Sequence, residues 1–232
     1  MKLQNTFLIV LTVAALAGIP RMAPGQVTLD DFSTGPYQKT LTTGFDQSFQ
    51  TGGMIGSERF TTFFFCLTKT CAPQANPFGQ AGSFQISPAT PTAPSALIYS
   101  AGYKATPELV VIYGQRASLN LKKIPPPTYD RLRLSFDGNT AITNFLIYAW
   151  SGNTNVSTLS CHIFPHEYPF TVDLPYENFQ LKAGTGADFT NISAMSLVLT
   201  DDFITGGNDW AITKFEGILD IAPLGDVTCD NH

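Results

Sequence analysis

The stretch Tyr129–Gly138, YDRLRLSFDG, alternates apolar and polar residues with a period of two. The apolar positions are Leu132, Leu134 and Phe136, and the polar positions between them are Arg131, Arg133 and Ser135. Successive side chains of a β-strand point to opposite faces. The stretch is therefore predicted to be a strand with one face in a core and the other in water. A shift of one residue in its pairing would exchange the two faces, so its register is strongly specified.

The rest of the chain repeats this kind of segment and shows no sustained helical periodicity. The apolar stretches are short, rich in β-branched and aromatic residues, and separated by Gly, Pro, Asn and Asp, which is typical of strands and turns. The expected strands are Val27–Phe32, Arg59–Cys66, Ser83–Ser87, Ala96–Ala101, Glu108–Tyr113, Tyr129–Phe136, Thr143–Trp150, Val156–Phe164, Pro169–Leu174, Ala194–Thr200 and Trp210–Ile221. This pattern favours an all-β fold, an antiparallel two-sheet, jelly-roll-like sandwich.

One of these strands, in the stretch NFLIYAWSG at Asn144–Gly152, is apolar on both faces. Leu146, Tyr148 and Trp150 would lie on one side, and Phe145, Ile147 and Ala149 on the other. A sheet over a single core needs one apolar face, so the second face calls for another layer of protein or a ligand. Two interpretations stay open. Tyr148 and Trp150 form an aromatic platform for a ligand, or they belong to the core while Phe145 and Ile147 pack under a loop.

The last expected strand, Trp210–Ile221, carries the second candidate for a ligand contact. Its alternation predicts inward Ala211, Phe215, Leu219 and Ile221, and outward Trp210, Lys214, Glu216 and Asp220. An outward tryptophan among charged residues is typical of a contact site. Trp210, Lys214 and Glu216 are therefore predicted, together with Tyr148 and Trp150, to bind a ligand.

The N-terminus has the pattern of a secretory signal peptide. Lys2 precedes the apolar run Phe7–Ile19, which is too short to span a bilayer and is followed by small residues. A cut after Gly25 would leave residues 26–232 as a single β-sandwich domain, and a cut near Ala15-Leu16-Ala17 is the alternative. No later segment is apolar enough to span a membrane. We expect the protein to be secreted or periplasmic.

The charge of the chain argues against one class of partner. Without residues 1–25 the chain would keep 11 basic residues against 18 acidic ones, because Lys2 and Arg21 leave with the signal peptide. A nucleic-acid partner would require a basic stripe, so none is expected. No G-x-S-x-G elbow or H-E-x-x-H motif is present. Glycoside hydrolysis would require two carboxylates facing across a cleft, and the candidates for them are Glu58, Glu108, Glu167, Glu177 and Glu216.

Four cysteines, Cys66, Cys71, Cys161 and Cys229, suggest two disulfides in an exported chain. Three pairings are possible. The short spacing of Cys66 and Cys71 allows a local bridge, which would leave Cys161 with Cys229 and tie the C-terminal tail to the body. The pairing stays open. The spacing does not fit a zinc ribbon, and in CHIFPHEY a loop with solvent-exposed His162 and His166 is favoured over a metal site.

The order of several motifs resembles the jelly-roll sandwiches of carbohydrate-binding modules. These motifs are VTLDDF, IGSERF, DRLRLSFDG, PFTVDLPYENF, ADFTNISAMSLVLT and WAITKFEGILDI, beginning at Val27, Ile55, Asp130, Pro169, Ala187 and Trp210. TGGMIGSERF is also similar to a stretch in a group of exported bacterial proteins. The first resemblance implies a structural calcium where the first and last strands meet, with Asp31 and Asp220 as ligands, since calcium prefers carboxylate and carbonyl oxygens.

The resemblance and the aromatic residues together imply non-catalytic binding of an extracellular carbohydrate, a polysaccharide or another glycan. A structural or adhesive surface-matrix protein that self-associates through its extra apolar face is the alternative. A polysaccharide-active enzyme is the third. Because one fold supports many functions, the choice among these depends on where the aromatic side chains lie.

Overall fold

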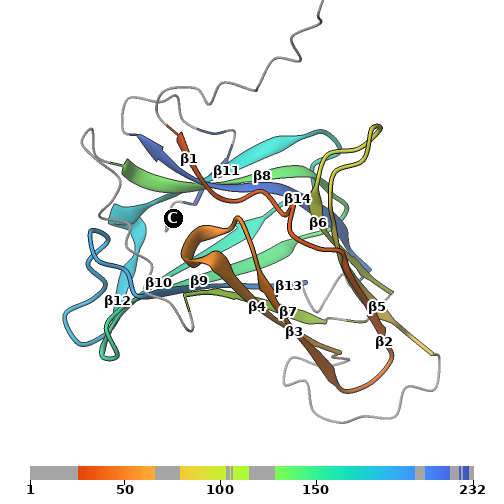
Figure 1. Ribbon diagram of the computed structural model, residues 1–232, viewed down its shortest axis with the longest axis horizontal. Helices are drawn as coiled ribbons and strands as arrows, with labels where there is room; N and C mark the ends of the chain where they lie inside the picture. The colour runs from red at the N-terminus through yellow and green to blue at the C-terminus, as the bar shows by residue number, and fades with distance from the viewer. Residues whose placement is uncertain are drawn as a thin grey trace, which may run out of the picture.

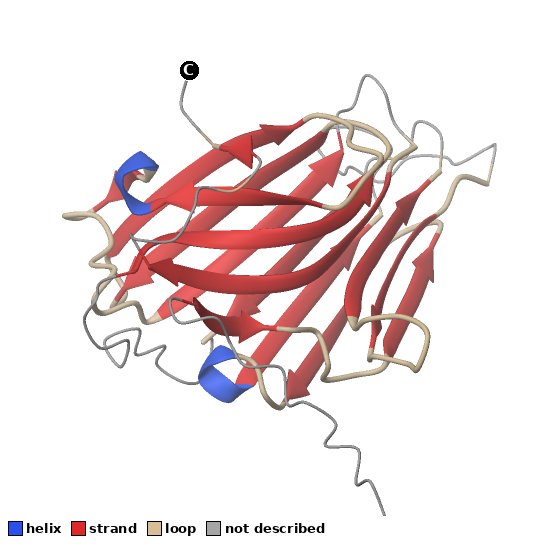
Figure 2. Ribbon diagram, turned by 90° about the horizontal axis from the view of Figure 1, so that it is seen from above, coloured by secondary structure: helices blue, strands red, loops and turns tan. Residues whose placement is uncertain are grey.

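The fold is a sandwich of two β-sheets, in a computed structural model that describes residues 26–65, 79–102, 105, 107–114, 129–201, 207–219, 225 and 227–229. Figure 1 shows one sheet above the other, and Figure 2 shows strands in both layers. The strands of the described residues pair antiparallel, except that β11 and β15 pair in parallel. The predicted all-β, two-sheet, jelly-roll-like architecture is confirmed.

The first layer is an eight-stranded sheet. In order it contains β15 (Val227–Thr228), β11 (Phe170–Pro175), β8 (Tyr129–Asn139), β14 (Asp209–Leu219), β6 (Ala96–Ala101), β5 (Gly82–Ser87) and β2 (Tyr37–Leu41), with β1 (Gln26–Asp30) also paired to β14. The pairing of β1 with β14 confirms that the first and last long strands lie side by side.

The second layer is a seven-stranded sheet. In order it contains β12 (Gln180–Ala183), β10 (Asn155–Ile163), β9 (Thr143–Ser151), β13 (Ala194–Asp201), β7 (Glu108–Tyr113), β4 (Glu58–Phe64) and β3 (Phe45–Thr51). Two short 3₁₀ turns, η1 (Ile55–Ser57) and η3 (Tyr176–Asn178), interrupt the connections. No helix of the described residues is long and apolar enough to cross a membrane.

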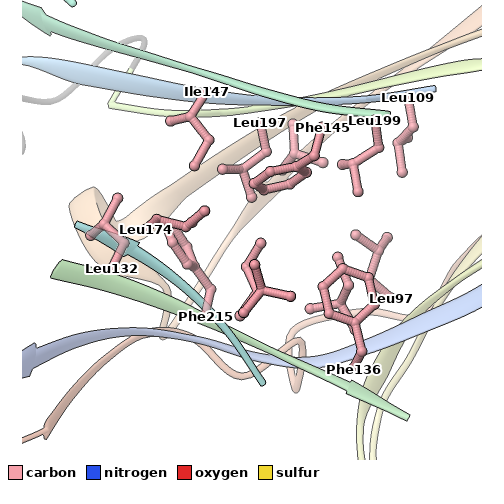
Figure 3. Packing of buried hydrophobic residues seen from close by; sticks show 14 of the residues in the cluster. Leu97, Leu109, Leu132, Phe136, Phe145, Ile147, Leu174, Leu197, Leu199 and Phe215 are labelled. Atoms are coloured by element: carbon pink, nitrogen blue, oxygen red, sulfur yellow. The ribbon is translucent and has the colours of Figure 1, made fainter. Parts of the chain in front are cut away.

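The core lies between the two sheets and is built from alternate side chains of both. Figure 3 shows five labelled residues of the seven-stranded sheet facing five of the eight-stranded sheet. The first set is Leu109, Phe145, Ile147, Leu197 and Leu199, and the second is Leu97, Leu132, Phe136, Leu174 and Phe215. Burying such side chains stabilises the fold by roughly 1.5–3 kcal/mol each, so the two inner faces hold the layers together.

The polar side of YDRLRLSFDG differs from its prediction. Arg131 and Arg133 do lie on the face opposite the core, but they are buried rather than in water. The carboxylate of Asp173, on the neighbouring strand β11, forms ion pairs with both guanidinium groups at 3.0 and 2.6 Å. The backbone N–H of Gly225, in the segment before β15, donates to the same carboxylate at 2.6 Å. The C-terminal segment therefore reaches a face that the alternation assigned to water.

A disulfide joins the two layers at one side of the sandwich. Cys161, on the core side of β10, is bonded to Cys229, which follows β15, with a Cα–Cα distance of 5.4 Å. The backbone N–H of Cys229 donates to the carbonyl of Asp173 at 3.1 Å, and Asn178 Nδ2 donates to the carbonyl of Cys229 at 2.8 Å. One of the expected pairings is therefore confirmed. Cys66 and Cys71 lie outside the described residues, and their pairing stays a prediction.

A buried ion pair ties the N-terminal strands to the core. Arg59 Nη1 contacts Asp30 Oδ2 at 2.5 Å, and both side chains are almost fully buried. The hydroxyl of Tyr113 donates to the same oxygen at 2.9 Å. Arg59 Nη2 also donates to the carbonyl of Thr34 and to Gln50 Oε1, each at 2.6 Å. These hydrogen bonds surround the buried charges of Asp30 and Arg59, as a buried ion pair requires.

Candidate ligand-binding face

The two apolar sides of strand β9 lie in different surroundings. Phe145, Ile147 and Ala149 are buried in the core, whereas Tyr148 and Trp150 are partly exposed on the outer side of the seven-stranded sheet. The interpretation that put Tyr148 and Trp150 in the core is therefore wrong. The two sides differ because only the first faces the eight-stranded sheet.

The two outer rings lie next to each other. The ring centroids of Tyr148 and Trp150 are 5.6 Å apart with an interplanar angle of 27°, which is a stacked arrangement. Stacked aromatic pairs contribute about 0.5–1.5 kcal/mol beyond the area they bury, so each ring restricts the position of the other. The pair presents a partly exposed aromatic surface along β9.

Small and hydroxyl-bearing residues flank this surface on the two neighbouring strands. Tyr148 pairs with Thr158 of β10 and Ser196 of β13, and residues opposite each other in an antiparallel pair share a face. Trp150 pairs with Val156 and Ala194. Because these neighbours are shorter than the aromatic side chains, the two rings form a ridge on the sheet with hydroxyl groups beside it.

The ridge ends in polar residues further along β9. His162 and Asn144 are paired across β10 and β9, and His162 Nδ1 lies 2.5 Å from Asn144 Oδ1. Ser160 is exposed opposite Leu146. Hydroxyl, amide and imidazole groups therefore line the strand beyond the aromatic pair. The sequence predicted a loop with His162 and His166 both exposed to solvent. His162 is exposed but lies on β10, and His166 is half-buried, in a bridge with Asn139 of β8.

Trp210 does not lie where the alternation placed it. It is 3 % exposed, stacks on Tyr99 with ring centroids 4.6 Å apart, and packs edge-on against Phe136. The prediction of an outward Trp210 is therefore wrong. Ile212 pairs with Phe136 and Lys214 with Ser135, so Thr213 is an extra residue on β14. Such a bulge shifts the alternation by one residue.

Lys214 and Glu216 do lie on the outer face of the eight-stranded sheet, but they do not accompany Trp210. Lys214 Nζ forms an ion pair with Glu216 Oε1 at 2.5 Å, and Glu216 itself is buried opposite Arg133. Glu216 also lies opposite Thr28 of β1 on its other side. The five residues predicted to bind a ligand are thus divided. Tyr148 and Trp150 stack on one sheet, Lys214 and Glu216 form an ion pair on the other, and Trp210 lies in the core.

The predicted calcium ligands are not both described. Asp31 is exposed and accepts a hydrogen bond from the backbone N–H of Ser33 at 3.0 Å, and Asp220 lies outside the described residues. The neighbouring Asp30 points inward to Arg59 instead. Within the part of the chain that the structure describes, no group of three His, Cys, Asp or Glu could hold a metal ion. Calcium at Asp31 and Asp220 stays a prediction.

Solved structures with a similar arrangement include carbohydrate-binding proteins. A family 11 carbohydrate-binding module from a cellulosomal cellulase of Clostridium thermocellum shares 12% identity, covering 91% of this chain and 100% of that one, with a TM-score of 0.40. The same module in complex with a β-1,3-1,4-mixed-linked tetrasaccharide shares 12% identity, covering 85% and 97%, with a TM-score of 0.40. The agarase AgWH50C shares 9% identity, covering 86% of this chain and 25% of that one, with a TM-score of 0.42.

The identity and the TM-score are low for all three structures. The fold of this chain is therefore assigned from its own strand pairing. No protein-family model matches the sequence. A search of curated proteins also finds no match.

Proposed function

We propose that this protein binds an extracellular polysaccharide, without acting on it, at the ridge formed by Tyr148 and Trp150. The observation that carries the proposal is the stacked pair of partly exposed rings on the outer face of the seven-stranded sheet. An aromatic pair on a sheet face is accessible to a long, flat polymer in a way that a closed pocket is not.

The chemistry of the ridge suits a sugar. The C–H face of a pyranose ring is apolar, and stacking it on an indole or phenol removes apolar area from water at about 25 cal/mol per Å². The hydroxyl groups of the sugar then need partners at the rim. Thr158, Ser160 and Asn144 offer hydroxyl and amide groups on the same face of the sheet.

The proposed location is outside the cytoplasm, secreted or periplasmic. The disulfide between Cys161 and Cys229 supports this proposal, because structural disulfides persist in oxidising compartments. Residues 1–25, with the pattern of a signal peptide, fit the same location.

A pull-down with insoluble cellulose, chitin, xylan, mannan and agarose tests the proposal. The unaltered protein is expected to sediment with at least one of these polymers, and Trp150→Ala is expected to lose that binding with an unchanged far-UV spectrum. Tyr168→Ala is the matched control, because Tyr168 is an aromatic residue 77% exposed in the loop after β10, off the ridge. Retention by none of the polymers, or equal retention of Trp150→Ala, overturns the proposal.

Self-association is the second candidate, favoured by the apolar character of the face beyond the ridge. Ser196 lies opposite Tyr148, Ile112 lies opposite Ser196, and Phe60 lies opposite Ile112, so one row crosses four strands. At the edge of the sheet Phe49 of β3 lies opposite Phe60 and is 39% exposed, and Phe45, further along the same face of β3, is 60% exposed. Contiguous apolar surface of this kind is typical of interfaces. An oligomer that forms with rising concentration in the absence of glycan, and is lost in Phe45→Ala, would support this candidate.

A further inference from the structure

A second group of side chains lies on the same outer face as the ridge, toward the other end of β9. The pairing register places one row of residues across the strands from β3 to β10. In that order the row is Phe45, Phe64, Glu108, Thr200, Asn144 and His162. Residues that lie opposite each other in antiparallel strands share a face. Asn144 and Tyr148 are an even number of residues apart on β9, so the row lies on the face of the ridge.

Glu108 is the carboxylate of this row, and the protein leaves it without a partner. The side chain is half-buried and forms no hydrogen bond or ion pair with any residue that the structure describes. Burial raises the pKa of the Glu108 carboxyl above its ordinary value, because the charged form loses water. A carboxylate that is covered without receiving hydrogen bonds is destabilising. A ligand that covers Glu108 therefore has to bring hydrogen-bond donors.

Aromatic rings lie beside this carboxylate on the two strands at the edge of the sheet. Phe64 of β4 is opposite Glu108, and its ring centroid is 5.7 Å from that of Phe45 on β3. Apolar ring surface and an unused acceptor are thus combined on one face. A sugar fits this combination, because it has an apolar C–H face and hydroxyl donors at its rim. A purely apolar partner, such as the same face of a second copy, would cover Glu108 without a donor.

Glu108 and the ridge are too far apart for one sugar unit to contact both. Glu108 lies on β7, two strands from β9 in the order β9-β13-β7, and neighbouring strands are about 4.8 Å apart. Its row crosses β9 at Asn144, six residues before Trp150, and a strand rises about 3.3 Å per residue. The diagonal from Trp150 to Glu108 is therefore about 22 Å. That distance is the length of a short oligosaccharide.

We propose that the glycan bound at the ridge extends diagonally across the sheet and that Glu108 accepts hydrogen bonds from the hydroxyl groups of a distant sugar unit. This inference rests on the proposed function, because the ridge supplies the first contact. The outward residues on the path between them, Ser196, Val198 and Val110, have short side chains over which a chain of sugars can lie. The charge of Glu108 repels uronic-acid and sulfated sugars, so the ligand is a neutral polysaccharide.

Oligosaccharides of two lengths test whether Glu108 contacts the ligand. The disaccharides and hexasaccharides of cellulose, chitin, xylan, mannan and agarose are titrated calorimetrically into the unaltered protein and into Glu108→Gln. The hexasaccharide that binds should lose affinity by about tenfold or more in Glu108→Gln. The matching disaccharide, which is too short to reach from the ridge, should bind both proteins equally. Glu177→Gln is the matched control, because Glu177 is exposed on η3, after β11 of the other sheet.

The outcomes separate this inference from the proposed function. Hexasaccharide binding that is lost in Trp150→Ala but unchanged in Glu108→Gln overturns the role of Glu108 and leaves the ridge as the site. Equal weakening of the disaccharide and the hexasaccharide in Glu108→Gln also overturns it, because a general structural defect has that effect. Preferred binding of alginate or polygalacturonate overturns the neutral ligand. Binding of none of the polymers and oligosaccharides overturns both the inference and the proposed function.

Discussion

Cys161 of the seven-stranded sheet is covalently bonded to Cys229, which follows the edge strand of the eight-stranded sheet, across 68 residues of sequence. The bond therefore closes one side of the sandwich and holds the C-terminal segment beside Asp173 of β11. In the chain-entropy description a loop of this length stabilises the fold by about 4 kcal/mol at 25 °C.

The first prediction concerns this bond. The double substitution Cys161→Ala, Cys229→Ala should lower the free energy of unfolding by about 2–5 kcal/mol, measured by urea denaturation. Mild reduction of the unaltered protein should have a similar effect. An unfolding midpoint that does not move in either case would contradict a structural role for the bond.

The second prediction concerns the buried pair of Asp30 and Arg59. Arg59→Met leaves the Asp30 carboxylate without its cation, so the free energy of unfolding should fall by about 3–5 kcal/mol. Lys39→Met is the matched control, because Lys39 forms a partly exposed ion pair with Asp46. Such pairs contribute only about 0–1 kcal/mol. Urea denaturation should show a clearly larger loss of unfolding free energy in Arg59→Met than in Lys39→Met. Equal losses would contradict a larger contribution of the buried network to stability.

The third prediction is a loss of stability at alkaline pH. Burial raises the pKa of Tyr113 and Tyr176 well above the ordinary value, with further increases from the nearby carboxylates of Asp30 and Asp130. A phenol whose pKa is raised by folding stabilises the fold fully below the unfolded pKa of about 10. That stability is then lost as pH rises toward the folded pKa, by up to about 1.4 kcal/mol per pH unit for each tyrosine.

Urea denaturation between pH 8 and pH 11 measures this slope. Tyr113→Phe should make the slope shallower above about pH 10, because one tyrosine that resists ionisation in the folded state is gone. The assignment fails if Tyr113→Phe and the unaltered protein have the same pH dependence.

The fourth prediction concerns the close approach of β8 to the segment between β10 and β11. Gly138→Ala should lower the free energy of unfolding by more than about 1 kcal/mol. The φ of Gly138 is +129, and the new Cβ would lie 3.2 Å from the His166 carbonyl oxygen. Gly44→Ala is the control, because Gly44 also has a positive φ of +73 but open space around its Cβ position. In thermal unfolding, Gly138→Ala should therefore have a clearly lower midpoint temperature than Gly44→Ala.

The alternation of side chains was sufficient to predict the interior strands of both sheets. Each expected strand is present with bounds close to those predicted, because a strand buried between two neighbours and over a core carries a strong apolar pattern. The strands that were not predicted are β2, β3, β12 and β15, and these four form the edges of the two sheets. Edge strands are paired on one side only and tolerate polar residues. Lys182 in QLKA and Lys39 in YQKTL show that composition.

Two features of the site depend on contacts that alternation does not encode. The bulge at Thr213 turns Trp210 into the core, and nothing in the sequence WAITKFEG marks the extra residue. Arg131 and Arg133 look like solvent-exposed positions, but they are buried in ion pairs with Asp173 of the neighbouring strand, which also accepts a hydrogen bond from the backbone N–H of Gly225. In contrast, the apolar residues on both faces of β9 did predict the aromatic pair. One face of this strand is in the core, and Tyr148 and Trp150 lie on the face away from it.

The central claim is that Trp150 contacts glycan on an outer sheet face, and its own fluorescence tests this most directly. In Trp210→Phe, Trp150 is the remaining tryptophan. Its emission should be quenched readily by acrylamide in the free protein, and a polysaccharide that sediments the protein should protect it when added in soluble form. Quenching that stays the same when that polysaccharide is bound would contradict the claim.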